Sequence, residues 1–118
     1  MKFSILISSY NKADYLEKCL DSCLLQSNKN FEIILVDNFS SDNTSNILKK
    51  YTKDVVIIKK SKVSEYPSVN QIDLLKEAFK VSTGEIICLL DADDFFLENK
   101  IHMLNKFFAD NENINIIF

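Results

Sequence analysis

The sequence feature that most constrains the fold is the run from Ile86 to Phe96, in which five apolar residues lead directly into three acids. A short, unbroken apolar run is typical of a strand buried on both faces of a parallel sheet. In open α/β sheets, ligands bind outside the carboxyl ends of the strands, so Asp91, Asp93 and Asp94 are expected at a site of chemistry. Two carboxylates about 5 Å apart repel by roughly 3 kcal/mol at an effective dielectric near 20, and a cation would relieve that repulsion.

The composition limits the classes of protein to which the chain can belong. With 118 residues it is expected to form a single domain, residues 1–118, without internal repeats or linkers. Apolar residues at 47% and charged residues at 26% are ordinary for a globular protein. The net charge of −3 gives no general affinity for nucleic acid or for an anionic membrane. The first apolar run ends at Ser8, which is too short for a signal peptide or a transmembrane helix.

The three cysteines do not form an even disulfide set. The spacing between Cys19 and Cys23 matches neither a redox CxxC motif nor a common zinc site. Both residues fall on the apolar stripe of a predicted helix, so we expect buried free thiols rather than metal ligands or redox groups. Free thiols favour a cytoplasmic location, either in solution or at the inner face of the membrane.

Two kinds of apolar segment alternate along the chain. Short runs predict strands over residues 3–8, 31–36, 55–58, 85–90 and 114–118. Helical spacing predicts helices over residues 11–26, through 47–51, over 68–81 and over 98–109. The side chains expected to face the core from the three longer helices are Tyr15, Leu16, Cys19, Leu20, Cys23 and Leu24; Ile72, Leu75 and Phe79; and Ile101, Leu104, Phe107 and Phe108. This alternation predicts a three-layer α/β/α domain with a largely parallel sheet.

Polar side chains follow three of the predicted strands. They are Ser8, Ser9, Tyr10 and Asn11; Asp37 and Asn38; and the acids that begin at Asp91. The carboxyl ends of neighbouring parallel strands lie side by side, so a nucleotide can lie across them. In that arrangement Tyr10 lies near the base, Asp37 or Asn38 contacts the base or the ribose, and the acids lie near the phosphates.

The acids suit a divalent cation. A leaving diphosphate develops negative charge, which such a cation neutralises. Carboxylate oxygens select hard cations such as Mg²⁺ or Mn²⁺ over Zn²⁺, and no histidine lies in the cluster. Magnesium takes only one or two protein carboxylates and completes its coordination with phosphates and water, which suits an Asp-x-Asp pair.

Each of these features also has a purely structural interpretation. Acidic turns after strands are common, and Asp94 can simply cap the segment that follows. Asp37 and Asn38 can be turn residues, and the lysine-rich stretch 59–62 can be a solvated strand end rather than a phosphate contact. His102 has no partner motif. The single glycine of the chain argues against the Gly-rich loops of Rossmann dinucleotide sites and P-loops.

Four blocks of sequence, in this order, resemble glycosyltransferase family 2. They are ILISSYN (5–11), SCLLQ (22–26), VDNFSSDNT (36–44) and GEIICLLDADD (84–94). The resemblance covers nearly all of this chain, but only the N-terminal, nucleotide-binding part of a typical family member. It implies a Rossmann-like GT-A fold and a nucleotide-diphosphate sugar as the donor.

The resemblance also implies roles for particular residues. Those expected to contact the nucleotide sugar are Ser8, Ser9, Tyr10, Asn11, Asp37, Asn38, Asp91 and Ala92. Asp93 is expected to be the principal protein ligand of Mn²⁺ or Mg²⁺, with Asp91 in support. A subgroup of the family with Gln and Asp early in the helix over 68–81 makes Gln71 and Asp73 further candidates for the donor site.

The chain departs from the family pattern in two places. Asn38 and Phe39 stand where the pattern Asp-Asp-Gly-Ser has its second acid and its glycine, and an amide both donates and accepts hydrogen bonds. Residues 74–77 lack the small-Arg-Asn pattern of many members. The carboxylate base of inverting members lies further along the chain, so no catalytic base is assigned within residues 1–118.

By this resemblance, the predicted function is the metal-assisted, inverting transfer of a sugar from a nucleotide-diphosphate sugar to an acceptor hydroxyl, in surface polysaccharide or glycoconjugate synthesis. The expected acceptor is a glycan or a lipid-linked sugar, with peripheral membrane association through regions outside this sequence. The alternative is a non-catalytic or truncated nucleotide-binding or interaction domain on the same fold.

Overall fold

The computed structural model describes residues 1–61 and 63–116, in which strands and helices alternate. The elements are β1 (Phe3–Ser9), α1 (Ala13–Leu24), β2 (Phe31–Asp37), α2 (Thr44–Leu48), a 3₁₀ helix η1 (Lys49–Tyr51), β3 (Val56–Lys59), α3 (Pro67–Val81), β4 (Ile86–Asp91) and α4 (Lys100–Asp110). This order confirms the predicted alternation up to α4. The strand predicted over 114–118 is not formed in its described part, because 114–116 have no regular structure; 117–118 lie outside the described residues.

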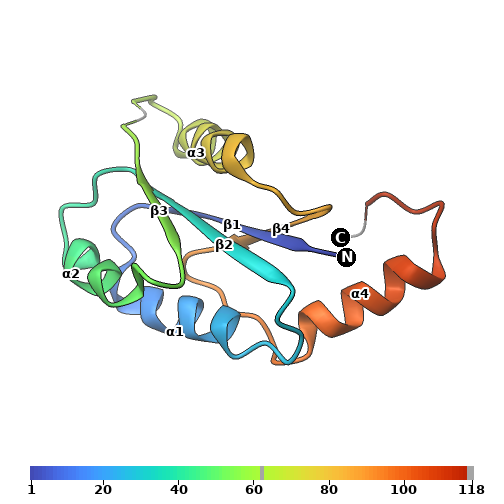
Figure 1. Ribbon diagram of the computed structural model, residues 1–118. Helices are drawn as coiled ribbons and strands as arrows, with labels where there is room; N and C mark the ends of the chain where they lie inside the picture. The colour runs from blue at the N-terminus through green and yellow to red at the C-terminus, as the bar shows by residue number, and fades with distance from the viewer. Residues whose placement is uncertain (62, 117–118) are drawn as a thin grey trace.

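The sheet in the described residues has four strands in the order β3-β2-β1-β4, and every neighbouring pair is parallel. Ser9 at the end of β1 pairs with Asp37, and Ser8 pairs with Asp91. Figure 1 shows α3 on one face of the sheet and α1, α2 and α4 on the other. The three-layer α/β/α prediction is confirmed, and the polar ends of three strands meet at one edge.

β1 is buried along its whole length because helices cover both of its faces. Ile5 and Ile7 belong to the larger core cluster, which includes residues of α1, α2 and α4. Leu6 points to the opposite face, where it shares a smaller cluster with Leu74 and Ala78 of α3. The alternation follows the two-residue period of a strand and makes β1 the centre of the fold.

β4 differs from the predicted strand that is buried on both faces. Cys88 and Leu90 are buried in the larger core cluster, but Leu89 is 62% exposed. The reason is the position of the strand: β4 is the edge of the described sheet, and α3 packs on β1 and β2. The apolar run therefore predicted the strand correctly but not the burial of its second face.

The prediction for the buried face of α3 is wrong in part. The buried residues of the helix are Leu74 and Ala78, while Ile72 and Phe79 are exposed and Leu75 is partly buried. Leu74 and Ala78 are four residues apart and lie on one face of the helix, which packs on the sheet. The helix is therefore rotated relative to the stripe expected from its largest apolar residues.

The predicted faces of α1 and α4 agree better with the structure. The buried residues on these helices are Leu16, Cys19, Leu20 and Cys23 on α1, and Ile101 and Leu104 on α4. Leu24, Phe107 and Phe108 are partly buried, whereas Tyr15 is exposed. In residues 1–61 and 63–116, no helix has both the length and the apolar character needed to cross a bilayer.

All three cysteines are buried free thiols, as predicted. Burial raises the pKa of the Cys19 and Cys23 thiols to about 12 and that of Cys88 to about 11. The reactive thiolate form is therefore suppressed at neutral pH.

The amino-terminal edge of the sheet is held by the carboxylate of Glu32. It accepts hydrogen bonds from Ser4 Oγ at 2.6 Å, from Thr83 N at 2.6 Å and from Lys2 Nζ at 3.3 Å. Burial acts to raise the pKa of this carboxyl, but the hydrogen bonds from Ser4, Thr83 and Lys2 outweigh it and hold the pKa at about 2. Gly84 completes the contact by donating its N–H to Ser4 Oγ at 2.8 Å.

Candidate functional site

A pocket of about 770 Å³ opens at the carboxyl-terminal edge of the sheet. It lies between the ends of β1 and β4, the residues after β2, and the first turns of α3 with the segment before them. The predicted contact residues that line it are Ser8, Ser9, Tyr10, Asn38, Gln71, Asp91, Ala92 and Asp93. Asn11, Asp37 and Asp73 are not among the residues that line the pocket.

Three carboxylates cluster after β4, and two of them, those of Asp91 and Asp93, line the pocket. Asp91, Asp93 and Asp94 are exposed, and one oxygen from each lies within 4.8 Å of the others. A tight turn brings Asp94 back to this group, because its N–H donates to Asp91 O at 2.9 Å. Three carboxylate oxygens at this spacing fit a hard cation such as Mg²⁺ or Mn²⁺, which uses one or two of them and leaves positions for phosphate and water.

Among the described residues, Lys12 forms an ion pair with this cluster. Its Nζ donates a hydrogen bond to Asp93 Oδ2 at 2.9 Å, and both side chains are about two-fifths exposed. The hydrogen bond with Asp93, together with its negative charge, raises the pKa of Lys12; the bond from Lys12 lowers the pKa of Asp93. Sequence reasoning did not single out Lys12, although it directly follows the polar residues after β1 and lines the pocket.

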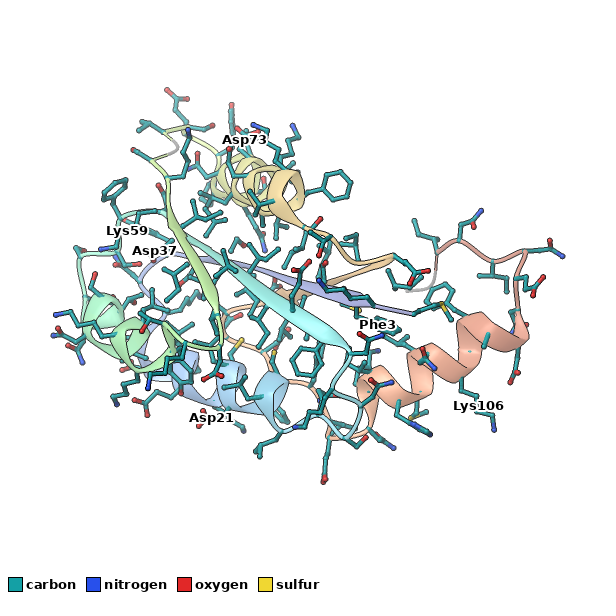
Figure 2. The ribbon with its side chains drawn as sticks, viewed as in Figure 1. Phe3, Asp21, Asp37, Lys59, Asp73 and Lys106 are labelled. Carbon is teal, nitrogen blue, oxygen red and sulfur yellow. The ribbon has the colours of Figure 1, made fainter. Side chains whose placement is uncertain are left out.

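Gln71 connects α3 to the acids. Its Nε2 donates to Asp91 Oδ1 at 2.6 Å, so one residue of the predicted donor site positions another. Asp73, two residues further along, pairs instead with Lys76 at 3.4 Å. Figure 2 shows Asp73 on α3, apart from Asp37 and Lys59 at the sheet edge. The structure therefore brings Gln71, but not Asp73, to the acids.

Asn11 joins two loops at the edge of the pocket. Its φ of 51° lies in the left-handed region, which asparagine tolerates better than most residues. Its Oδ1 accepts from Ser41 N at 2.8 Å, and its own N–H donates to Ser40 Oγ at 2.9 Å. The side-chain oxygen predicted to contact a nucleotide is thus engaged in fixing the loop after β2 against the loop after β1.

Asp37 shapes the loop that follows β2. It is fully buried, and its two oxygens accept from Ser40 N at 3.0 Å and from Ser40 Oγ at 2.5 Å. These bonds hold the turn in which Asn38 and Phe39 reach the pocket wall. Phe39 adopts a φ of 49°, a left-handed conformation that strongly favours glycine, the residue that the family pattern has at this position.

Two aromatic side chains lie at the pocket, one on each of these loops. Tyr10 and Phe39 both line it, and each is more than half exposed. Exposed aromatic rings on a polar edge are suited to stacking against a flat, partly polar ring such as a nucleobase. Tyr10 was predicted from the sequence, but Phe39 was noted only as a departure from the family pattern.

Two buried polar atoms at the pocket lack a hydrogen-bond partner among the described residues: Ser9 Oγ and Asn70 Oδ1. Asn70 lies four residues before Leu74 on α3, and its Nδ2 donates to Ser64 O at 3.3 Å. An unpaired buried acceptor costs about 1–3 kcal/mol, which a ligand N–H or O–H would recover. Asn70 was missed because an asparagine on a helix gives no sequence signal of its own.

The segment after the acids is tied to α1 by a buried glutamine. Gln26 is fully buried; its Nε2 donates to Leu97 O at 2.7 Å, and its Oε1 accepts from Ile101 N at 2.9 Å. Nearby, Ser22 Oγ accepts from Phe96 N at 3.0 Å. These bonds fix the segment that follows the acids against the block 22–26.

The sequence places the chain in a known family. The family model for Glycosyl transferase family 2 matches residues 4–118. The chain therefore belongs to glycosyltransferase family 2, as its four sequence blocks predicted.

Individual relatives and structures agree with this assignment. The poly(ribitol-phosphate) beta-glucosyltransferase of Bacillus spizizenii is 34% identical over 117 residues, which are 95% of this chain and 18% of the relative. S. aureus TarS in complex with UDP-GlcNAc superposes with a TM-score of 0.83 at 26% identity, over 95% of this chain and 32% of the TarS chain.

A more distant structure shows the same fold. The mannosyltransferase PcManGT from Pyrobaculum calidifontis, in complex with GDP-Man and Mn²⁺, superposes with a TM-score of 0.74 at 22% identity, over 93% of this chain and 33% of that chain. The GT-A fold is thereby confirmed. The chain spans between 16% and 38% of the length of the curated relatives that it matches.

Proposed function

We propose that the protein transfers a sugar from a nucleotide-diphosphate sugar to an acceptor hydroxyl, and that this chain supplies its donor site. The observation that carries the proposal is the pocket of about 770 Å³, which is lined by two aromatic side chains, by Asp91 and Asp93 of the carboxylate cluster, and by Ser9 and Asn70. Buried polar atoms of Ser9 and Asn70 have no hydrogen-bond partner among the described residues. The volume lies in the range of small-ligand sites. A nucleotide sugar needs all three kinds of group: a stacking surface, hydrogen-bond partners and a counter-ion for its diphosphate.

We propose that the base lies at the Tyr10 and Phe39 end of the pocket. Asn70 Oδ1 is a buried acceptor without a partner in the described residues, so it suits an N–H of the base or a hydroxyl of the ribose. UDP-GlcNAc and GDP-Man are the donors in the two structures compared above. Both bases, uracil and guanine, carry a ring N–H beside a carbonyl, which an asparagine amide matches with one acceptor and one donor.

We propose that the diphosphate lies against the acids through a divalent cation. Asp93 and Asp91 would hold Mn²⁺ or Mg²⁺, with Asp94 close enough to contribute a third oxygen. When bound, this cation neutralises the charge that develops on the leaving diphosphate. Gln71 holds the carboxylate of Asp91 in place, and Gln26 holds the segment that follows the acids.

The reaction's other parts are proposals of the same kind. The chain covers 38% or less of the length of eight curated relatives, so we propose that the catalytic base and the acceptor site belong to the rest of the protein. We also propose that the reaction inverts the anomeric centre. A glycan or lipid-linked sugar is the proposed acceptor, for surface polysaccharide or glycoconjugate synthesis. The free buried cysteines are consistent with a cytoplasmic location.

Calorimetric titration of the purified protein with UDP and GDP, with and without Mn²⁺, tests the proposal. At least one nucleotide should bind, and Mn²⁺ should tighten its binding. Asp93→Asn should weaken the Mn²⁺-dependent binding by roughly 100-fold, because loss of an outer partner of a metal ligand already costs 10- to 100-fold.

Asp54→Asn is the matched control, because Asp54 is an exposed carboxyl in the turn before β3, away from the pocket lining. It should bind as the unaltered protein does. If no nucleotide binds, the donor site is refuted and an interaction domain becomes the better account. If binding is indifferent to Mn²⁺ and to Asp93→Asn, the metal part alone is refuted.

A further inference from the structure

We propose that Lys12 is an internal counter-ion of the acid cluster: it occupies Asp93 until a divalent cation displaces it, and it then binds the donor's diphosphate. This inference rests on the proposed function, because it assigns a role to one more residue of the same site. Loss of Lys12 should therefore tighten the binding of the metal ion and weaken the binding of the nucleotide.

The geometry puts Lys12 on one of the two oxygens of the carboxylate that the metal needs. Its Nζ lies 2.9 Å from Oδ2 of Asp93, the carboxylate expected to be the principal metal ligand. A metal ion bound to the same carboxylate oxygen would lie close to the Lys12 ammonium. The two positive charges would then repel each other strongly. Metal binding therefore requires the Lys12 ammonium to move away from Asp93 or to shift to another partner.

The charge of the cluster explains why such a counter-ion is present. One carboxylate oxygen from each of Asp91, Asp93 and Asp94 lies within 4.8 Å of the others, and uncompensated like charges at this spacing repel one another. Lys12 supplies one positive charge to this group. In the state without metal, the ammonium thus stabilises the loop that the metal stabilises later.

The side chain of Lys12 can leave Asp93 without disturbing helix α1. Helix α1 uses only the backbone of this residue: Lys12 O accepts from Tyr15 N and from Leu16 N, both at 3.0 Å. The side chain is 41% exposed and carries its charge on a flexible four-carbon stem. Its displacement breaks an exposed ion pair, which is an interaction of modest strength.

Lys12 has a second partner available once it leaves Asp93. The residue lines the same pocket as Asp93, Ser9 and Tyr10, so its ammonium stays beside the space proposed for the donor. A lysine binds a phosphate oxygen as a point charge and needs no fixed orientation to do so. The displaced ammonium therefore contributes to diphosphate binding, and donor and metal binding reinforce each other.

The test measures the binding of Mn²⁺ alone, and then of UDP with Mn²⁺ present, to the purified protein. Free Mn²⁺ is followed by its electron paramagnetic resonance signal at low ionic strength. Lys12→Met should tighten Mn²⁺ binding about two- to fivefold, the range expected for release of an exposed ion pair. With Mn²⁺ saturating, the same variant should bind UDP about three- to tenfold more weakly, because a charged contact to phosphate is lost.

Two further variants control for charge and position. Lys12→Arg keeps the cation and should stay near the unaltered protein in Mn²⁺ affinity. Lys18→Met removes a positive charge from the same helix, where Lys18 Nζ lies 3.9 Å from the centroid of the Phe95 ring. It should change Mn²⁺ affinity less than Lys12→Met does. The melting temperature of each variant shows that the fold is retained.

The outcomes separate the two proposals. If Mn²⁺ binds with equal affinity to the unaltered protein and to Lys12→Met, Lys12 does not compete for Asp93 and the inference is overturned, while the metal site stands. If Lys18→Met tightens Mn²⁺ binding as much as Lys12→Met, the effect is one of net charge and the inference is again overturned. If Mn²⁺ binds neither protein, the metal part of the proposed function is refuted and the inference falls with it.

Discussion

Carboxylates lie at both edges of the sheet, in opposite circumstances. At the amino-terminal edge, Glu32 accepts hydrogen bonds from three residues, and its carboxyl pKa is held at about 2. At the carboxyl-terminal edge, Asp91, Asp93 and Asp94 are exposed and have carboxylate oxygens within 4.8 Å of one another, and in the part of the chain that the structure describes Lys12 pairs with Asp93. The first carboxylate is satisfied by the fold itself, whereas the second group is left with oxygens for a ligand.

The difference teaches how to separate structural from functional acids in a protein of this type. A structural carboxylate is surrounded by fixed donors, so its removal should cost stability and leave binding unchanged. A functional cluster has too much negative charge for its protein partners, so its removal should cost ligand affinity and leave stability nearly unchanged. Substitutions at the two edges of the sheet should therefore differ in whether they change stability or ligand affinity.

Gln26→Leu should lower both stability and metal affinity, because Gln26 is buried and also holds the segment that follows the acids. The change leaves Leu97 O and Ile101 N without their partner. We expect a loss of about 3–4 kcal/mol in the free energy of unfolding, since each buried orphan costs about 1–3 kcal/mol. Urea denaturation measures it. Mn²⁺ affinity should also fall; unchanged affinity in the folded variant would show that the acids do not depend on this anchor.

Gly84→Ala should act on the amino-terminal edge alone. A Cβ at this position would lie 2.6 Å from Ser4 N and 2.7 Å from Phe3 C, both backbone atoms that cannot move independently. We expect a loss of about 2–3 kcal/mol in stability, as for other overpacked sites. Nucleotide affinity of the folded variant should not change. A lower nucleotide affinity would mean that a change at the amino-terminal edge is transmitted through β1 to the pocket.

Glu32→Gln should lower stability by roughly 2 kcal/mol at neutral pH, because hydrogen bonds to a charged acceptor are replaced by weaker ones. The pKa of Glu32 falls from its ordinary 4.5 to about 2 in the fold, so its stabilisation is complete above pH 4.5 and is lost as pH falls toward 2. The stability difference between the two proteins should therefore shrink from pH 6 to pH 3, by chemical denaturation. A difference that is constant over this range would contradict the structural role.

Phe39→Gly should have the smallest effect on stability and the opposite sign. Its φ of 49° strains any residue with a Cβ, and glycine removes that strain at the cost of a more flexible unfolded chain. We expect a gain of about 0.5 kcal/mol, with weaker nucleotide binding because an aromatic wall is lost. Phe39→Ala, which removes the ring but keeps the strain, is the control. It should lose binding without the gain in stability.

The sequence predicted local structure well because local structure depends on neighbouring residues. Apolar periodicity located every strand and helix up to α4, and the acids after β4 marked the edge of the sheet at which the pocket opens. It did not reveal that β4 lies at the edge of the described sheet, or that α3 turns Leu74 rather than Ile72 to the core. Those facts depend on how whole elements pack, which periodicity within one element does not contain.

The parts of the site that the sequence missed are contacts between distant residues. Lys12 and Asp93 are 81 positions apart, and neither residue indicates the other. Asn11 and Asp37 were predicted as nucleotide contacts, but the structure shows their oxygens bonded to the loop over residues 40–42. Such contacts form only when β1, β2 and β4 end at the same edge of the sheet. The order of residues along the chain therefore does not reveal them.

The central claim is that the acids at the carboxyl-terminal edge hold a metal that the fold itself does not supply. Anomalous diffraction at the manganese edge, from crystals of the protein grown with Mn²⁺ and UDP, tests it most directly. We expect a manganese peak at bonding distance from Asp93, with the UDP diphosphate beside it and Lys12 Nζ moved away from Asp93. A peak elsewhere, or UDP bound with the Lys12–Asp93 ion pair intact, would contradict it.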